Sequence, residues 1–300
     1  MSKASRFRKV AVVKGGPSSE REVSLRSGAA VARGLREAGY DVVEMDLTGR
    51  TVDLPRDIEA VFIALHGEFG EDGQVQRLLE EKGIPYTGSS PEASALAFDK
   101  MRTKEILRGK GILTPRYEVL AAGGRRTIDL PVVVKPSRQG SSIGVHRVFR
   151  EEEWALAFAD ALRYDSELIV EEYIRGRELT VGVVGEQVLP AVEIVAPGDW
   201  YSYDAKYSGG KTKYIAPAPL SAGVADMCAV AALQTFRALG CRGMGRVDFR
   251  LSPDTSAFVL ELNSIPGFTE TSLLPKAAQA AGISFPELCA GIMELAALGR

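Results

Sequence analysis

The sequence predicts an α/β protein whose first third holds a parallel sheet, and three observations support this fold class. Apolar strands are expected at 10–13, 41–45 and 61–65. Segments with helix start and stop signals lie between them. Strands that alternate with helices are typical of parallel sheets covered on both faces. A chain of 300 residues has room for two or three domains.

Helix signals follow the first and third strands. Ser19 is followed three residues later by Glu22, a capping box that predicts a helix from there to Ala38. A second helix is expected at 74–82. A glycine follows each of these segments and is expected to end the helix.

Two polar residues are expected at one rim of this sheet, because ligands of parallel sheets bind beyond the carboxyl ends of the strands. Glu20 lies at a helix start, where the helix dipole favours a carboxylate. As a residue of the cap region it would need no further function. His66 follows the third strand and, taken alone, is better explained as a structural loop residue.

The middle third begins with a helix opened by Pro91, with Asp99 along it or at a break. Strands are expected at 131–135 and 145–149, and the small-residue loop 136–144 joins them. Such a loop can present several N–H donors to phosphate oxygens. Most loops rich in glycine and serine, however, are only turns.

An amphipathic helix at 151–164 precedes a strand at 168–171, which runs into residues 172–174. After a turn, another strand spans 178–184. Apolar strand ends followed by acidic residues can hold an adenine and its ribose hydroxyls. Equally, these residues can form only a strand edge.

The last third opens with 199–211, which is aromatic, charged and glycine-rich together and lacks a helix or strand period. Long irregular segments in compact domains are usually lids or disordered, and the aromatic residues argue against disorder. Helices are expected at 223–239, 273–281 and 285–298.

The stretch 243–263 carries the most chemistry and is predicted to form two strands joined by a turn. Side chains alternate faces along a strand, so Arg246 shares a face with Asp248, and Glu261 with Asn263. A turn near the middle of the stretch places Asp248 opposite Glu261 and Arg246 opposite Asn263. Facing carboxylates repel. A magnesium ion between them would explain the arrangement, because hard oxygen ligands suit this cation.

The alternative for this hairpin is a solvated polar face, which is the usual explanation of a lone hairpin. The turn 263–267 follows at once and offers backbone N–H groups beside the expected metal. The position of this turn directly after the hairpin favours a functional site over a solvated polar face.

Composition excludes several classes of function. The formal net charge is −2, which does not suggest a nucleic-acid or membrane partner. Three cysteines without a C-x-x-C, and only two histidines, argue against disulfides, zinc and a histidine-rich metal centre. No signal region or apolar run of membrane-spanning length is found, so the protein is expected in the cytoplasm.

Taken together, these stretches resemble the D-alanine–D-alanine ligases of the ATP-grasp superfamily. The resemblance runs nearly end to end, and the shared order and spacing of its motifs are more specific than any one motif. The matching segments are 15–16 with 20–25, 65–67 with 70–73, 85–88, 99–100, 134–136 with 140–142, 205–207, 245–248, 261–263 with 266–269, and 272–273.

The resemblance implies an α/β, three-domain ATP-grasp architecture with an N-terminal domain at 1–95, a central one at 96–181 and a C-terminal one at 182–300. It implies that ATP drives the joining of two D-alanines through a D-alanyl phosphate, for peptidoglycan synthesis. It also implies two magnesium ions, for which manganese can substitute, and a homodimer.

The resemblance further assigns roles to individual residues. Those implied for catalysis are Glu20, Ser141, Tyr207, Arg246 and Gly267. Those implied for the nucleotide are Lys100, Lys135, Ser142, Glu171, Tyr173, Ile174, Glu178 and Lys206. Those implied for magnesium are Asp248, Glu261 and Asn263, and those implied for the amino acids are His66, Ser272 and Leu273.

In this assignment Glu20 binds the ammonium of the first D-alanine and Ser272 the carboxylate of the second. Arg246 and the Gly267 N–H stabilise the oxyanion of the tetrahedral intermediate. Tyr207 closes the lid toward Glu20. Ligases that use D-lactate lack this tyrosine, so an amine nucleophile is expected here.

Two departures from the family pattern affect single contacts: Phe268 stands in place of methionine, and Glu172 in place of lysine beside the adenine. One rival hypothesis is an ATP-dependent carboxylate–amine ligase of different amino-acid specificity. Another is a non-catalytic ATP-binding regulator. The complete catalytic set speaks against the regulator, since a binder needs no oxyanion donor.

Overall fold

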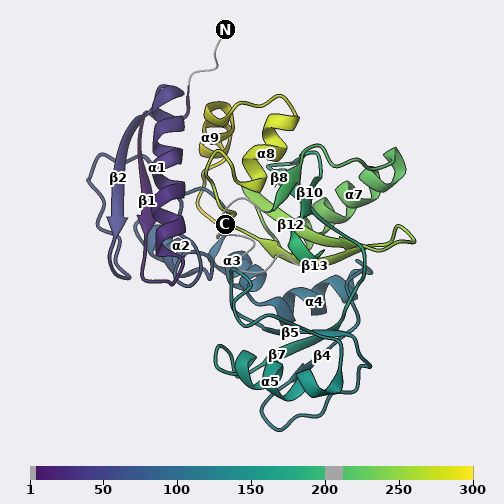
Figure 1. The fold of residues 1–300 in the computed structure, drawn as a ribbon. Helices are drawn as coiled ribbons and strands as arrows, with labels where there is room; N and C mark the ends of the chain where they lie inside the picture. The colour runs from purple at the N-terminus through teal and green to yellow at the C-terminus, as the bar shows by residue number, and fades with distance from the viewer. Residues whose placement is uncertain (1–4, 200–211, 300) are drawn as a thin grey trace.

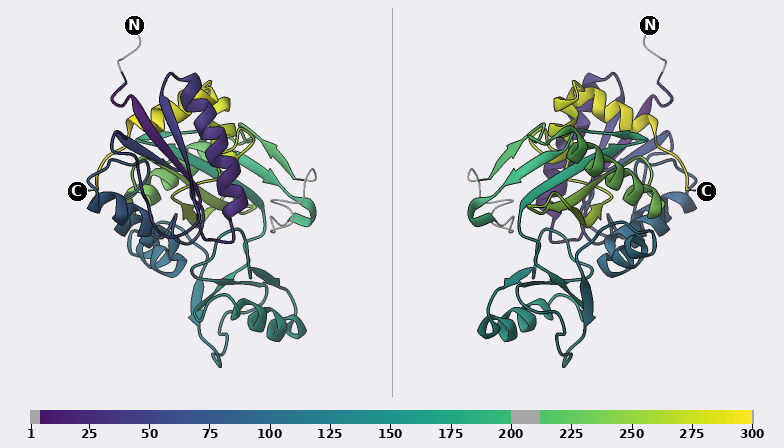
Figure 2. Two further views of the ribbon diagram at one scale, coloured as in Figure 1. Left: turned by 90° about the vertical axis from the view of Figure 1, so that its left-hand side faces the viewer. Right: turned by 90° about the vertical axis from the view of Figure 1, so that its right-hand side faces the viewer.

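The chain folds into three β-sheets that follow one another along the sequence, each accompanied by helices (Figure 1). This computed structural model describes residues 5–199 and 212–299. The middle sheet and its helix project away from the other two sheets in both side views (Figure 2). The mixed α/β architecture predicted from the sequence is confirmed.

The first sheet is parallel, as predicted, with β1 between its two neighbours in the order β2-β1-β3. Its strands are β1 (Lys9–Gly15), β2 (Asp41–Leu47) and β3 (Ala60–Ile63). Helix α1 (Arg21–Glu37) joins β1 to β2, and α2 (Gln74–Glu81) follows β3. Both helices lie within a residue or two of their predicted spans.

The start of α1 differs from the predicted capping box. Glu20, not Ser19, is the N-cap residue, and its side chain makes no capping hydrogen bond. The Ser18 hydroxyl accepts a hydrogen bond from Glu20 N (3.2 Å) and donates one to the His66 carbonyl (2.6 Å). The Glu20 carboxylate is therefore not used by the helix, and it accepts a hydrogen bond from the Ser141 hydroxyl instead.

Helices α3 (Pro91–Phe98) and α4 (Lys100–Gly109) meet at Asp99. Pro91 occupies the first turn of α3, as predicted, where its missing N–H costs nothing. Asp99 ends α3 and caps α4, because its carboxylate accepts a hydrogen bond from Arg102 N (3.1 Å). Of the two positions expected for Asp99, along the helix or at a break, the structure shows the break.

The second sheet is antiparallel and has the order β4-β7-β5-β6. Its strands are β4 (Tyr117–Leu120), β5 (Val132–Pro136), β6 (His146–Val148) and β7 (Leu168–Glu172). Helix α5 (Glu151–Ala161) covers one face, where its alanines join a small core with strand valines and Leu168. The first of these strands has no counterpart in the sequence analysis.

The third sheet is also antiparallel, in the order β11-β10-β8-β12-β13, with β9 paired to β8. Its strands are β8 (Arg177–Val184), β9 (Gln187–Val188), β10 (Val192–Val195), β11 (Lys213–Ile215), β12 (Met244–Leu251) and β13 (Ala257–Asn263). Helix α7 (Ala222–Ala238) packs on it through Ala232 and Phe236. A short 3-10 turn (Pro197–Asp199) follows β10.

The last two helices pack against the first sheet. Helices α8 (Leu273–Ala280) and α9 (Phe285–Glu294) share one core with β1 and β3. Within it the rings of Phe62 and Phe268 meet edge to face, with centroids 5.6 Å apart. The Glu294 carboxylate accepts a hydrogen bond from Arg6 N (3.0 Å). The two ends of the chain are thus joined in one core.

The expected domain boundaries fall within regular elements. The boundary between 95 and 96 lies inside α3, and that between 181 and 182 lies inside β8.

Candidate active site

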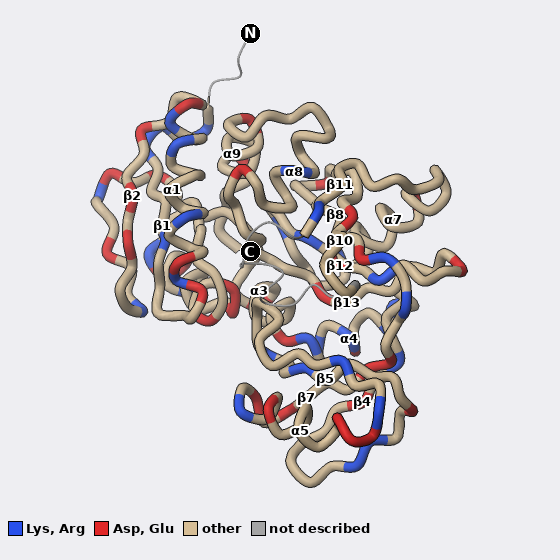
Figure 3. The backbone as a smooth tube through the Cα atoms, viewed as in Figure 1, with Lys and Arg blue, Asp and Glu red and all other residues tan. Residues whose placement is uncertain are grey.

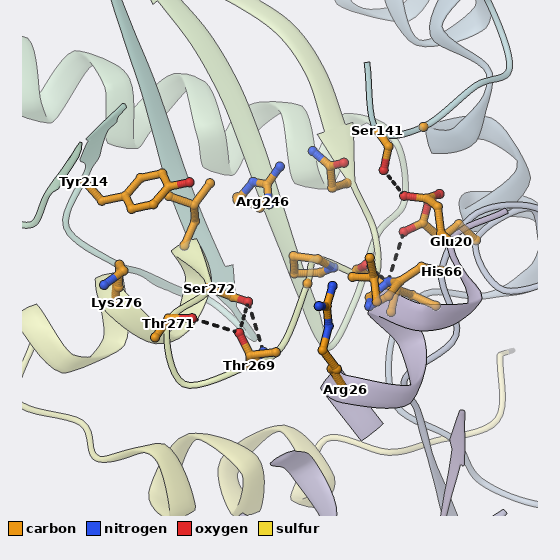
Figure 4. A pocket seen from close by; sticks show the side chains of 18 of the residues that line it. Glu20, Arg26, His66, Ser141, Tyr214, Arg246, Thr269, Thr271, Ser272 and Lys276 are labelled. Atoms are coloured by element: carbon orange, nitrogen blue, oxygen red, sulfur yellow. Dashed lines mark hydrogen bonds and ion pairs between the residues drawn. The ribbon is translucent and has the colours of Figure 1, made fainter. Parts of the chain in front are cut away.

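Two cavities meet at the loop between β5 and β6. The larger, of about 530 Å³, lies between the start of α1 and the turn after β13 (Figure 4). The smaller, of about 90 Å³, lies between the second and third sheets. Gly140 lines both. The cavities are called the amino-acid cavity and the nucleotide cavity below, after the ligands expected from the sequence.

Each described site residue lines one of these cavities, but the predicted magnesium residues are split, because Asn263 lines the amino-acid cavity and Asp248 and Glu261 line the nucleotide cavity. The amino-acid cavity is lined by Glu20, His66, Ser141, Arg246, Asn263, Gly267, Ser272 and Leu273. The nucleotide cavity is lined by Lys100, Lys135, Ser142, Glu171, Tyr173, Ile174, Glu178, Asp248 and Glu261. Lys206 and Tyr207 lie outside the described residues. Every predicted site residue that the structure describes therefore lies at one of two adjoining cavities.

The β12–β13 hairpin has the predicted register. Asp248 pairs with Glu261 across the strands, and Arg246 pairs with Asn263. A bulge follows Asp248 and shifts the remaining pairs by one residue before the turn. The two carboxylates thus start from directly opposed backbone positions and line the same cavity.

Asp248 is held by three neighbours. Arg246 approaches it with two nitrogens, each 2.9 Å from a carboxylate oxygen. The Asn263 amide and the Thr180 hydroxyl donate to it at 3.0 and 2.5 Å. Thr180 was not predicted, because it comes from β8 and only the pairing of β8 with β12 brings it close. The Asp248 carboxylate is therefore held in place by side chains from neighbouring strands of this sheet.

Glu171 lines the nucleotide cavity and lies between two lysines. Its carboxylate is 2.6 Å from Lys135 Nζ and 2.7 Å from Lys104 Nζ, and all three side chains are buried. Burial alone would raise the pKa of Glu171, but the two ammonium groups lower it overall. Burial lowers the pKa of Lys104 to about 8, although Glu171 opposes this effect.

Lys104 was missed in the sequence analysis. It lies four residues after Lys100 on α4, a spacing that brings two side chains to one face of a helix. Lys100 reaches toward the hairpin, 3.4 Å from Glu261, and donates to the Gln139 carbonyl (2.6 Å). Basic and acidic residues accordingly alternate where α4, β5, β7 and β13 come together (Figure 3).

Arg250 is a third residue that the sequence analysis missed, after Thr180 and Lys104. Arg246, Asp248 and Arg250 are two residues apart along one strand, so their side chains share a face. This spacing could have identified Arg250 from the sequence. Its guanidinium contacts the Glu178 carboxylate (3.2 Å) and the Ile174 carbonyl (3.1 Å). Arg250 therefore braces the segment predicted to hold the adenine and ribose.

The amino-acid cavity draws its polar groups from separate segments. Glu20 at the start of α1 pairs with Ser141 of the loop between β5 and β6 (Figure 4). Ser141 and Ser142 both have left-handed backbones, with φ of 52° and 58°, which is uncommon for serine. The tight loop carries these hydroxyls to the boundary of the two cavities.

A half-buried carboxylate lies in the wall of this cavity. Glu71 lies 3.7 Å from His66 Nδ1, and its pKa is raised because burial disfavours its charged form. Both residues line the cavity wall. Glu71 belongs to a matching segment of the sequence but was not assigned a role there.

Ser272 lies on the opposite wall, at the N-terminus of α8. Its hydroxyl accepts from Thr269 N (3.0 Å) and contacts the Thr269 hydroxyl (2.8 Å). Several hydroxyl groups and a helix N-terminus thus face the cavity together (Figure 4), and such an arrangement suits a carboxylate.

Two antiparallel sheets that enclose a cavity of paired lysines and carboxylates, joined to an N-terminal parallel sheet, define an ATP-grasp enzyme of the carboxylate–amine ligase class. Family models support a narrower assignment. Residues 47–89 match the D-ala D-ala ligase N-terminus and residues 110–294 match the D-ala D-ala ligase C-terminus. The chain belongs to the D-alanine–D-alanine ligase family.

Individual relatives agree with this assignment. A D-alanine–D-alanine ligase of Syntrophotalea carbinolica is 47% identical over 98% of this chain and 97% of its own length. One from Methylacidiphilum infernorum is 45% identical over 97% and 96%.

Solved structures show the same fold. The D-alanine–D-alanine ligase of Bacillus anthracis complexed with ATP superposes with a TM-score of 0.85 at 33% identity, covering 96% of this chain and 97% of its own. The VanG D-Ala:D-Ser ligase of Enterococcus faecalis also has a TM-score of 0.85, at 28% identity, covering 97% and 99%. The predicted ATP-grasp fold is confirmed.

Proposed function

We propose that this protein uses ATP to join two D-alanines into D-alanyl-D-alanine, the dipeptide of peptidoglycan synthesis. ATP phosphorylates the carboxylate of one D-alanine, and the amine of a second displaces phosphate from the acyl phosphate. The single observation that carries the proposal is the junction of the two cavities at Gly140. There a nucleotide phosphate and an amino-acid carboxylate can meet.

Magnesium is proposed as the metal, with two ions, and the donor set fits it. Asp248 and Glu261 present hard carboxylate oxygens from opposed strand positions, and Asn263 adds an amide. Within 5–199 and 212–299 no three carboxylate, histidine or cysteine side chains are grouped so that they could hold a metal ion by themselves, so phosphate oxygens would complete the coordination. When bound, the ions neutralise phosphate charge during transfer; manganese has the same preference for oxygen ligands.

The positive charge that phosphoryl transfer needs is available from the chain itself. Lys100 and Lys135 line the nucleotide cavity from α4 and β5. Such transfer depends on positioning and charge neutralisation more than on covalent help from the protein. Ser141, Ser142 and their loop would cover the phosphates, and Lys206 would add charge from the 199–211 segment.

On the amino-acid side, Glu20 would bind the ammonium of the first D-alanine. Arg246 lines this cavity and also contacts Asp248, which supports the proposal that it would stabilise the oxyanion of the tetrahedral intermediate. Ser272 at the start of α8 would hold the carboxylate of the second D-alanine, with Leu273 and His66 as neighbours. Tyr207 would close over Glu20 and Ser141.

The test is phosphate release with ATP, magnesium and D-alanine, followed by identification of the dipeptide. A panel of D-serine and D-lactate as second substrates addresses the rival specificities, and the likeness to a D-Ala:D-Ser ligase makes D-serine the sharper comparison. Turnover with D-lactate equal to that with D-alanine near neutral pH would refute the amine nucleophile. ATP binding without D-alanine-dependent phosphate release would favour the regulator.

We further propose a homodimer acting in the cytoplasm. Among the described residues, no helix combines the length and apolar character needed to cross a bilayer. All three cysteines are free thiols, which suits a reducing compartment. The dimer rests on the family resemblance, and sedimentation of the purified protein tests it.

A further inference from the structure

A buried hydrogen-bonded bridge connects α1 to the turn that follows β13. Ser27 of α1 is fully buried, and its hydroxyl oxygen accepts a hydrogen bond from Phe268 N (3.1 Å). The same oxygen lies 3.1 Å from His66 Nε2. The other ring nitrogen, Nδ1, lies 3.1 Å from the Ile265 carbonyl. Two residues of the first third of the chain thus hold two peptide groups of the last third.

These contacts also fix the tautomer of His66. Nδ1 faces two acceptors, the Ile265 carbonyl and the Glu71 carboxylate, so it carries the proton. In the neutral ring Nε2 is then an acceptor, and the Ser27 hydroxyl donates to it. That hydroxyl has a lone pair left for Phe268 N–H, so each group in the bridge has a complementary partner.

The two held peptide groups flank a third. The Ile265 carbonyl belongs to the peptide before Pro266, and Phe268 N belongs to the peptide after Gly267. Between them lies the Pro266–Gly267 peptide, which carries the Gly267 N–H. Pro266 has a fixed φ, and Phe268 is anchored among Phe62 and Phe285. The orientation of the Gly267 N–H is therefore set from both sides.

We propose that Ser27 is a positioning residue for the ligase reaction, which acts through His66 and Phe268 to aim the Gly267 N–H into the amino-acid cavity. This inference rests on the proposed function, in which Gly267 donates to the oxyanion. It gives His66 a role in holding the turn, since both of its ring nitrogens are engaged by groups of the protein.

Ser24 provides a matched control. It lies one turn earlier on α1 and is equally buried. Among the described residues its hydroxyl accepts a hydrogen bond from Gly15 N (2.8 Å) and donates one to the Ala64 carbonyl (2.7 Å). Ser27→Ala and Ser24→Ala thus remove the same group from one helix, but only the first change touches the turn. Ser27→Ala is expected to lower kcat about tenfold, because a small misplacement of a catalytic group is costly, and to leave KM for ATP unchanged.

The experiment combines these rates with nitrogen NMR of histidine-labelled protein. The chain has only two histidines, so His146→Gln assigns both spectra. His66 is expected as the Nδ1–H tautomer, with its Nε2 signal shifted by Ser27→Ala and not by Ser24→Ala. Ser27→Thr, which keeps the hydroxyl, should retain the Nε2 signal and recover most of kcat.

An Nε2–H tautomer, or equal kcat losses in Ser27→Ala and Ser24→Ala, would overturn the proposal. The spectra do not depend on turnover. If the wild-type protein made no dipeptide but His66 had the expected tautomer, only the proposed function would be contradicted. A changed Nε2 signal in Ser27→Ala would still support the contact between Ser27 and the turn.

Discussion

The two adjoining cavities are built in different ways. Around the nucleotide cavity, acidic side chains on neighbouring strands already have basic partners, as Asp248 has Arg246 and Glu178 has Arg250. Around the amino-acid cavity, polar groups come from a helix start, a loop and a turn that are distant in sequence. Glu20 and Ser141, for example, are 121 residues apart. Strand register organises the first cavity, whereas contacts between separate segments organise the second.

Arg246 lines the amino-acid cavity and contacts Asp248 of the nucleotide cavity, and its loss should have the largest effect. Arg246→Ala removes the proposed oxyanion donor and the bidentate partner of Asp248. We expect kcat to fall about 10²–10³-fold, the usual cost of one such donor, measured by ADP release at saturating substrates. Arg237→Ala, which breaks an exposed pair with Glu186, should change kcat by less than about twofold. A mutant that kept a third of wild-type kcat would contradict this role.

Glu261 tests the nucleotide side alone. Glu261→Gln should raise the magnesium concentration needed for half-maximal activity by about tenfold or more. Mutating a residue that only hydrogen-bonds to a metal ligand already lowers metal affinity or activity by about 10–100-fold. Magnesium removal by a chelator should abolish wild-type turnover. The matched variant on the other side, Ser272→Ala, should raise KM for D-alanine without changing the magnesium requirement. If both variants shifted the magnesium requirement equally, the separation of the two cavities would be wrong.

Glu171 tests whether the buried charges stabilise the fold. Glu171→Gln leaves Lys104 and Lys135 without their shared carboxylate, and unfolding in urea should be easier by roughly 3–5 kcal/mol at pH 7. The folded pKa of Glu171 lies below its unfolded value of 4.5. Its contribution is therefore complete above pH 4.5 and lost as the pH falls through the folded pKa. Wild type and mutant should converge in acid; a constant difference would exclude this linkage.

Glu172 should give the smallest effect. It is exposed at the nucleotide cavity and stands where the family commonly has lysine. Glu172→Lys should lower KM for ATP by at most about fivefold, the range of an exposed charge contact, and leave KM for D-alanine unchanged. Initial rates at varied ATP concentrations give the KM for ATP. A change only in the KM for D-alanine would contradict the placement of Glu172 at the nucleotide cavity.

The same contrast between the cavities explains what could be predicted from the sequence. The alternation of residues 246–251 and 258–263 depends only on strand geometry, so the pairing of Asp248 with Glu261 was predictable. The spacing of Lys104 from Lys100 and of Arg250 from Asp248 could have been noticed in the sequence. Their acidic partners, Glu171 and Glu178, became clear only from the fold.

Contacts between distant segments were not predictable in this way. The predicted capping box at Ser19 was wrong. The Ser18 hydroxyl accepts the hydrogen bond from Glu20 N and donates one to the carbonyl of His66, a residue distant in sequence. Thr180 and Ser27 have no motif that marks them. Short strands such as β10 and β11 exist because neighbours pair with them, and three or four residues carry little pattern of their own.

The shared core of β1, β3, α8 and α9 has a consequence for synthesis on the ribosome. The first third of the chain emerges early, but the helices that cover it are made last. Until residues near 290 have left the exit tunnel, apolar side chains such as Phe62 lack their final cover. Nascent chains of this protein should therefore depend on chaperones during elongation, and a fragment ending near residue 95 should aggregate instead of folding alone.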